Sequence, residues 1–336
     1  MKRIGIICPS EIAFRRFLPA LSEAGCFEYA GVAIASKKEF VGATDEILAK
    51  ERSKAQSFVD SYGGEIFEGY NRLIHSDGID AVYLPLPPGL HYKWAKEAVS
   101  AGKHILVEKP CTTSFSDTED LVNDADGKEL AAHENYMFAF HNQLEAINGI
   151  VDSGEIGAVR LYRVSFGFPM RAQNDFRYNK ALGGGALLDC GGYTLKYASM
   201  LLGPTAQIKY AQSNCIDGFS VDMYGSAALV NENGVTVQVA FGMDHNYKCE
   251  LEVWGSKGTI YTNRILTAPA GLVPEMIIRK GNEEEKRNLP ADDAFKKSIL
   301  HFYHCIENRE LRKANYQILL RQAKLVDDFR KLAGII

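Results

Sequence analysis

The residue of this sequence that is best placed for chemistry is Lys109. It follows a short apolar run, His104–Glu108, and precedes Pro110, which fixes the backbone φ angle directly after the lysine. A run of this kind is typical of a buried parallel strand, and open parallel sheets bind their ligands at the carboxyl ends of the strands. We therefore expect Glu108 and Lys109 at a binding site, although a solvated lysine at the end of a strand would explain the same residues.

A glycine-rich segment carries a second pair of reactive side chains. Three glycines, 183–185, run into an expected helix that carries Asp189 and, four residues later, Tyr193. This spacing puts the carboxylate and the phenol on one face of the helix. The glycines 191–192 each cost a helix about 1 kcal/mol relative to alanine, which indicates that another group packs closely against this turn. A helical tyrosine is more often a core residue, so this pair indicates a functional site only when it is combined with Lys109.

The first expected strand, Arg3–Cys8, leads into a turn that departs from the glycine pattern of dinucleotide-binding folds. Two glycines of G-x-G-x-x-G/A are replaced, and only Ala13 fits the pattern. Ser10 is small enough for a pyrophosphate to approach closely, and the start of the next helix still offers N–H groups to an anion. The residues expected to contact a cofactor at this turn are Cys8, Ser10, Glu11 and Ile12.

The end of the second expected strand, Tyr29–Ala35, indicates which dinucleotide would bind. An NAD site typically has an acidic residue here that accepts from the ribose hydroxyls. This chain has Ser36 and Lys37 instead, which would bind a 2′-phosphate that a carboxylate would repel. We therefore expect NADP, with NAD as the other candidate and a solvated loop as the alternative explanation.

The loop Pro85-Leu86-Pro87 follows the fourth expected strand at the same edge of the sheet. A stiff loop at that position would lie along the nicotinamide half of a dinucleotide. His91 begins the next helix, and it could contact the cofactor or only cap the helix. Together with Glu108 and Lys109, these four residues complete the expected cofactor-binding set.

The elements that must position these groups divide the chain into two expected domains. Over residues 1–135 strand and helix patterns alternate, which predicts a dinucleotide-binding domain with a doubly wound parallel sheet. Over 136–336 an α+β domain for substrate binding and oligomerisation is expected. Its region 207–262 has several strands separated only by turns, which indicates a mostly antiparallel sheet. The last expected helix, 315–332, could pack back on the first domain.

Composition excludes several classes of function. The 336 residues are 24% charged with a net charge of −4, so the chain lacks the basic surface that nucleic acid or an anionic membrane would attract. Its seven cysteines include no CxxC pair and no Cys/His cluster with metal-ligand spacing. These features are typical of a reduced, cytoplasmic protein with no metal site.

The motifs together resemble the glucose–fructose oxidoreductase / inositol dehydrogenase / rhizopine catabolism (Gfo/Idh/MocA) superfamily. The resemblance implies a Rossmann domain followed by an α+β domain with a large open sheet, often used to form homo-oligomers, so we expect a homodimer or homotetramer. It also implies hydride transfer between a nicotinamide and a sugar or cyclitol carbinol carbon. The matching segments follow one another along nearly the whole chain: Arg3–Ile7, Leu18–Leu21, Ala33–Ser36, Gly102–Pro110, Glu134–Met137, Phe140–Gln143, Gly154–Gly157, Gly183–Tyr193 and Trp254–Gly258.

The resemblance also implies roles for single residues. Lys109 matches the lysine of the family's Glu-Lys-Pro motif, and Asp189 and Tyr193 match its helical acid and its acid/base residue. Many members have histidine in place of Tyr193; tyrosine there resembles glucose–fructose oxidoreductase, dihydrodiol and xylose dehydrogenases, and nucleotide-sugar 3-ketoreductases. The segment Asp175–Tyr178 is most similar to the last two groups. Arg177 within it could meet a nucleotide diphosphate or form a structural ion pair.

A mechanism follows for these residues. A ketone that accepts hydride develops an alkoxide and needs a proton, and Tyr193, with an ordinary pKa near 10, could supply it if Lys109 lowered that pKa. Asp189 would orient sugar hydroxyls or the Lys109 amine. The leading hypothesis is thus an NADP-dependent oxidoreductase acting on a sugar, with a nucleotide-linked keto sugar as one candidate. The alternatives are a free-aldose or trans-dihydrodiol dehydrogenase, and a non-catalytic sugar- or nucleotide-sensing regulatory protein of the same fold.

Overall fold

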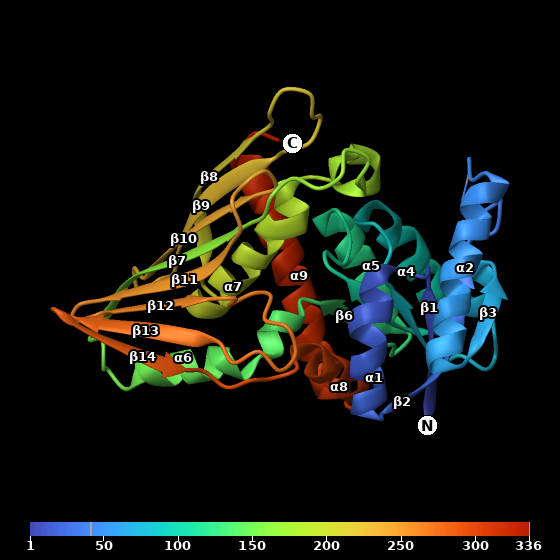
Figure 1. Ribbon diagram of the computed structural model, residues 1–336, viewed down its shortest axis with the longest axis horizontal. Coiled ribbons are helices and arrows are strands. Elements are labelled where there is room, and N and C mark those ends of the chain that lie inside the picture. The colour runs from blue at the N-terminus through green and yellow to red at the C-terminus, as the bar shows by residue number, and fades with distance from the viewer. Residues whose placement is uncertain (41, 336) are drawn as a thin grey trace. The chain divides into compact units, whose positions relative to one another are not determined.

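The structure, a computed structural model, describes residues 1–40 and 42–335, which form two compact units (Figure 1). Helices α8 (Ala294–Glu307) and α9 (Arg309–Leu332) lie near the end of the chain, yet they contribute residues to the first unit. The first unit consists of Met1–Asn135 and Phe295–Leu320, and the second of Tyr136–Ala294 with the described residues from Arg321 on.

The first unit is built on a parallel sheet of six strands. The strand order is β3-β2-β1-β4-β5-β6, so the direction of winding reverses between β1 and β4. Ligands of doubly wound sheets bind in the crevice at such a reversal. The expected doubly wound parallel sheet is confirmed. The strands are β1 (Lys2–Ile7), β2 (Phe27–Ile34), β3 (Glu65–Glu68), β4 (Ala81–Leu84), β5 (His104–Glu108) and β6 (Ala132–Asn135).

The central strands of this sheet are apolar along most of their length because helices cover both of their faces. Every residue of β4 is fully buried, as are Ile4, Ile6 and Ile7 of β1. Such strands read as continuous apolar runs, which made them recognisable in the sequence. The helix after β1 starts with a π-helical turn, Ala13–Phe17, before it becomes α1. The helices between the strands are α1 (Leu18–Ala24), α2 (Asp45–Tyr62), α3 (Tyr70–Ile74), α4 (His91–Ser100) and α5 (Phe115–Gly127).

The second unit is built on a sheet of eight strands in the order β14-β13-β12-β11-β7-β10-β9-β8. All neighbours pair antiparallel except β7 and β10, which are parallel, so the expected mostly antiparallel sheet is confirmed. The strands are β7 (Val159–Gly167), β8 (Gln207–Asn214), β9 (Tyr224–Val230), β10 (Thr236–Gly242), β11 (Lys248–Gly255), β12 (Thr259–Asn263), β13 (Glu275–Lys280) and β14 (Glu283–Asn288).

Two strands of this sheet, β13 and β14, follow the region 207–262 in which strands were expected, and sequence analysis missed them. Strand β14 reads Glu-Glu-Glu-Lys-Arg-Asn, and none of its side chains is fully buried. As an edge strand with charged residues on both faces, it has no alternation of apolar and polar residues for sequence analysis to detect.

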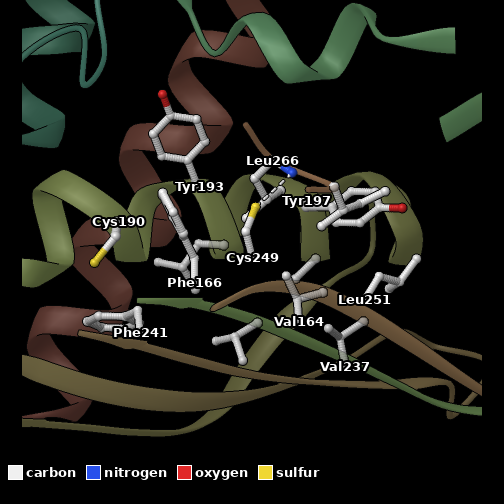
Figure 2. Close-up of a cluster of buried hydrophobic side chains, with 14 of the residues drawn as sticks. Val164, Phe166, Cys190, Tyr193, Tyr197, Val237, Phe241, Cys249, Leu251 and Leu266 are labelled. Atoms are coloured by element: carbon white, nitrogen blue, oxygen red, sulfur yellow. Dashed lines mark hydrogen bonds between the residues drawn. The ribbon is translucent and has the colours of Figure 1, made fainter. Parts of the chain in front are cut away.

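One face of this sheet packs against helices, and Figure 2 shows the resulting core. On β7 the side chains of Val164 and Phe166 are buried against this layer, whereas Arg163, directly before Val164, is exposed on the other face. From the last helix, Phe329 packs on Phe241 of β10, with ring centroids 5.6 Å apart. The helical elements of this unit are the 3₁₀ turns Met137–Phe140, Phe176–Tyr178 and Lys180–Leu182, the π-helical turn Leu187–Gly191, α6 (Asn142–Asp152) and α7 (Gly192–Leu202).

Candidate active site

The turn after β1 has the backbone shape that a dinucleotide site needs, although it lacks the usual glycines. Cys8 has a φ of 79°, in the left-handed region that favours glycine. Its N–H donates to the carbonyl of Ala33 on β2 (3.0 Å), and its own carbonyl accepts from Ser10 N–H (2.9 Å). Ser10 Oγ in turn accepts from a backbone N–H of the following helix (3.2 Å). These residues therefore fit a pyrophosphate at the start of this helix, where Glu11 and Ile12 lie.

The thiol of Cys8 is not a reactive group. Burial raises its pKa to about 12, although a hydrogen bond with Tyr70 acts in the opposite direction. The thiol therefore stays protonated at neutral pH, and only the thiolate is a strong nucleophile. The side chain of Glu11 is exposed at the turn and pairs with Arg15 (3.2 Å). The turn thus has the backbone shape and the N–H groups to bind an anion, but it supplies no reactive side chain.

The loop after β2 presents Ser36 and Lys37, as expected for a 2′-phosphate site. The carbonyl of Ser36 accepts from the N–H groups of Glu39 and Phe40, both at 3.0 Å, which closes a tight turn. The ammonium of Lys37 is exposed and pairs with Asp45 at the start of α2 (2.5 Å). Sequence analysis did not single out Glu39, whose carboxylate accepts from the N–H of Ser36 (2.8 Å).

His91 holds two loops together through both of its ring nitrogens. Nδ1 lies 2.7 Å from the carbonyl oxygen of Pro110, and Nε2 lies 2.6 Å from that of Leu86. The side chain is fully buried. Burial lowers the pKa of His91 to about 4, although both carbonyl contacts favour the charged ring. The ring thus joins the loop Pro85–Pro87 to the segment after Lys109, and a direct contact of His91 with a cofactor stays a prediction.

Glu108 is fixed at the end of β5, directly before Lys109. Its Oε1 accepts from the hydroxyl of Tyr83 (2.6 Å) and from Nδ2 of Asn135 (2.7 Å). Burial raises the pKa of Glu108, while these hydrogen bonds and the charge of Lys109 oppose that shift. The peptide bond between Lys109 and Pro110 is cis. Both hydrogen bonds to Glu108 come from the ends of neighbouring strands, and they fix the position of the backbone directly before Lys109.

A buried polar network connects Glu108 to helices α8 and α9. Asn135 Oδ1 accepts from the hydroxyl of Ser298 on α8 (2.8 Å), and Ser298 lies 2.9 Å from Nε2 of His133. Nδ1 of His133 lies 3.3 Å from Oδ1 of Asn315 on α9. Both helix residues come from more than 160 positions farther along the chain. No spacing in the sequence could have predicted that they support the Glu-Lys-Pro segment.

In the second unit, Arg177 is held by two carboxylates. Its Nε donates to Asp189 (2.6 Å) and its Nη1 to Asp175 (3.1 Å). Burial opposes the charge, but the two carboxylates raise the pKa of Arg177 above its usual value. Of the two roles left open for Arg177, the geometry shows the structural ion pair. Contact with a diphosphate stays a prediction, and Asp189 is oriented by an arginine that the sequence did not link to it.

Tyr193 has a buried ring and a hydroxyl that points out of the core. Only 8% of the residue is exposed. Its ring packs edge-on against Tyr136 and Phe166, with centroids 5.0 and 5.4 Å apart. Figure 2 shows its hydroxyl directed away from the sheet. Three residues later on the helix, the buried Lys196 has its ammonium 5.6 Å from the ring centroid of Tyr136, a neighbour that sequence analysis missed.

Glycines before and within this helix allow close approach. As the cost of glycines 191–192 in a helix indicated, another group packs closely there, since a Cβ on Gly192 would lie 2.2 Å from the hydroxyl oxygen of Tyr136. A Cβ on Gly184 would lie 2.4 Å from the carbonyl oxygen of Arg177, and one on Gly185 would lie 2.2 Å from Oδ1 of Asp222. Asp222 also caps the helix, because its Oδ2 accepts from the N–H of Leu187 (2.6 Å). The start of the helix that carries Asp189 and Tyr193 is thus fixed by a carboxylate 35 residues away.

The three expected catalytic residues are distributed over the two units. Lys109 belongs to the first, and Asp189 and Tyr193 belong to the second. Within the described residues, no group of His, Cys, Asp or Glu could hold a metal ion, and no helix is long and apolar enough to cross a membrane.

Comparison with known proteins identifies the family. The model of an oxidoreductase family with an NAD-binding Rossmann fold matches residues 12–136, and that of the GFO/IDH/MocA C-terminal domain matches 144–261. A dTDP-3,4-didehydro-2,6-dideoxy-alpha-D-glucose 3-reductase of Actinomadura kijaniata is 37% identical over 98% of this chain and 94% of its own. A D-xylose 1-dehydrogenase (NADP(+)) of Haloferax volcanii is 25% identical over 90% of this chain and 94% of its own.

A solved structure extends the similarity to three dimensions. The crystal structure of KijD10, a 3-ketoreductase from Actinomadura kijaniata in complex with NADP and TDP-benzene, matches with a TM-score of 0.88 and 37% identity. The match covers 98% of this chain and 97% of KijD10. An aldose–aldose oxidoreductase from Caulobacter crescentus, 23% identical over 99% of this chain and 98% of its own, shares the fold with a TM-score of 0.82. The chain therefore belongs to the Gfo/Idh/MocA family of NAD(P)-dependent oxidoreductases.

Proposed function

We propose that this protein uses NADPH to reduce the ketone of a nucleotide-linked sugar. The observation that carries the proposal is the similarity to KijD10, which covers nearly the whole of both chains and comes from a complex with NADP and TDP-benzene. KijD10 has also been crystallised with a lysine replaced and with a tyrosine replaced, and the spacing of those two positions equals that of Lys109 and Tyr193. This spacing supports the same pair of residues here.

The cofactor would be held by the elements of the first unit. The turn at Cys8 and Ser10 would receive the pyrophosphate, Ser36 and Lys37 the 2′-phosphate, and the loop Pro85–Pro87 the nicotinamide half. When bound, the nicotinamide supplies the hydride. The chain itself then has to place the ketone, stabilise negative charge on its oxygen and deliver one proton.

We assign the proton to the hydroxyl of Tyr193 and the charge stabilisation to the ammonium of Lys109. A positive charge beside a phenol lowers the phenol's pKa, and it also stabilises the alkoxide that forms as hydride arrives. Asp189, held by Arg177, would accept hydrogen bonds from the sugar hydroxyls and fix the ring. In the reverse direction Tyr193 would take the proton from the alcohol.

A second candidate function is supported by the xylose dehydrogenase among the relatives. Its activity would use the same residues but act on a free aldose, with NADP⁺ as the oxidant. One experiment separates the two functions. It compares the rate at which NADPH is consumed with a TDP-linked 3-keto sugar with the rate at which NADP⁺ is reduced with D-xylose. Faster turnover of the nucleotide sugar supports the proposal. Turnover of xylose alone would replace it with the second function, and turnover of neither substrate would contradict both.

A further inference from the structure

A carboxylate does lie next to the expected 2′-phosphate site, but it faces the protein. Glu39 follows Ser36 by three residues. Its Oε2 accepts from the N–H groups of Ser36 (2.8 Å) and Tyr70 (3.0 Å), and its Oε1 accepts from that of Asn71 (2.9 Å). Both oxygens are thus directed to the backbone. They connect the end of β2 to the first residues of α3.

The charge of Glu39 is stabilised where it lies. Although burial opposes it, hydrogen bonds from the backbone of Asn71, Ser36 and Tyr70 lower the pKa of Glu39. Glycine suits the position before α3, since Gly69 has a φ of 117°, in the region that favours glycine, and lies in contact with the Glu39 carboxylate. The N–H of Gly69 also donates to Ile34 at the end of β2 (2.9 Å), so the two segments are joined on both sides of the carboxylate.

This arrangement has a consequence for cofactor choice. A carboxylate directed at the ribose would accept from the 2′-hydroxyl of NAD and repel the 2′-phosphate of NADP. A carboxylate that binds backbone N–H groups instead fixes the turn from Ser36 to Phe40. The exposed ammonium of Lys37 is carried by that turn.

We propose that Glu39 is a positioning residue for the choice of NADP over NAD, because it holds the turn that carries Ser36 and Lys37 and keeps its own charge away from the ribose. Glu39 itself would not touch the phosphate. The inference depends on dinucleotide binding and not on the sugar substrate proposed above, and its test needs no sugar.

The test compares Glu39→Gln and Glu39→Ala with the wild type by fluorescence titration of NADPH and NADH. Glutamine keeps the shape but loses one acceptor oxygen and the charge. We expect the dissociation constant of NADPH to rise about tenfold or more in both variants, and that of NADH to change less than about threefold. The reason is that only NADPH carries the 2′-phosphate that the turn would bind. Titration with 2′-phospho-AMP and AMP should repeat the difference on the isolated end of the cofactor.

Two further variants control the experiment. Glu46→Gln removes a charge from exposed α2, where Glu46 pairs with Lys50, and should leave both affinities unchanged. Ser36→Asp places a carboxylate at the phosphate and should reverse the preference, which shows that the assay detects such a change. If Glu39→Gln weakened both cofactors equally, Glu39 would be a general structural residue. If it left both unchanged, or if NADPH bound more tightly, the proposal would also be overturned.

Should Glu39→Ala fail to fold, Glu39→Gln and Glu39→Asp carry the same comparison. The aspartate retains the charge but is one methylene shorter, so it can no longer reach all three N–H groups. The ratio of the NADPH and NADH affinities should fall in this variant too. An unchanged ratio with a normal melting temperature would contradict the proposal.

Discussion

Tyr193 combines a ring that belongs to the core with a hydroxyl that points out of it. Replacement by phenylalanine should therefore leave folding and NADPH binding nearly unchanged, because the ring contacts with Tyr136 and Phe166 remain. Turnover should fall by at least about a hundredfold, the usual scale for a general acid. The alkaline limb of the wild-type pH profile should disappear, because that limb reports loss of the phenolic proton. Steady-state kinetics between pH 6 and about 10 would measure both effects.

The matched control for this prediction is Tyr197→Phe, one helical turn later. The hydroxyl of Tyr197 is buried and has no hydrogen-bond partner among the described residues, and burial raises its pKa, so it stays neutral. Its removal should leave turnover unchanged and the free energy of unfolding equal or slightly higher. Turnover should fall as much in Lys109→Met as in Tyr193→Phe. The double variant should lose little more turnover than either single variant, because the effects of residues that act on one step do not add. Near-normal turnover in Tyr193→Phe would mean that the proton has another source.

At the scale of single elements, the helix that carries Asp189 and Tyr193 depends on Asp222. Asp222→Ala removes the acceptor of the Leu187 N–H, so the free energy of unfolding should fall by about 1–2 kcal/mol and turnover should fall with it. Asp222→Asn keeps an acceptor oxygen and should therefore retain most of the wild-type stability and turnover. NADPH affinity should not change in either variant, because Asp222 belongs to the second unit.

Thermal denaturation and kinetics on Asp222→Ala and Asp222→Asn test this dependence. Asp217→Ala, in the exposed loop before Asp222, is the control and should behave as the wild type. Equal turnover in Asp222→Ala and the wild type would show that the helix start needs no cap to place Tyr193.

Strand β14, which the sequence did not reveal, is attached through Glu155. Its carboxylate accepts from both terminal nitrogens of Arg287 on β14 (2.6 and 2.8 Å) and from Lys280 of β13 (3.1 Å). The hydrogen bonds from Arg287 and Lys280 lower the pKa of Glu155 to about 2. A lowered pKa of this kind stabilises the fold above the ordinary pKa of 4.5 and loses that contribution as pH falls toward 2.

Glu155→Gln should therefore lower the melting temperature at neutral pH. The difference from the wild type should shrink as pH falls from 4.5 toward about 2, because the wild-type carboxyl becomes protonated over that range. Glu284→Gln removes an exposed partner of Arg279 and should have little effect at any pH. A melting difference for Glu155→Gln that stayed constant from pH 7 to pH 3 would contradict this origin of the stability.

These elements also show what the sequence could predict. The parallel strands were visible because both of their faces are apolar, and their carboxyl ends located Lys109. Glu39 and Asp222 were not visible, because each accepts from a backbone N–H group far along the chain, at Tyr70 (31 residues) and Leu187 (35 residues), and such contacts leave no side-chain pattern. Contacts between side chain and backbone across a fold depend on tertiary structure alone.

At the scale of the whole molecule, the eight-stranded sheet presents a face that none of the described helices of the second unit covers in Figure 1. Trp254 on β11 and Tyr210 on β8 lie on it, 49% and 51% exposed. The guanidinium of Arg163 on β7 lies 5.6 Å from the Trp254 ring centroid. Large aromatic residues and arginine are typical of the centres of protein interfaces. We therefore retain the proposal of a homodimer or homotetramer formed through this face.

Trp254→Glu should dissociate that assembly, because it buries a charge at the centre of the interface and removes an aromatic anchor. Sedimentation at micromolar concentration should show an oligomer for the wild type and the 37.2 kDa monomer for the variant. Val273→Glu, at an equally exposed apolar residue in the loop before β13, should leave the oligomer intact. A monomeric wild type would rule out the assembly, and an oligomeric Trp254→Glu variant would show that another surface forms it.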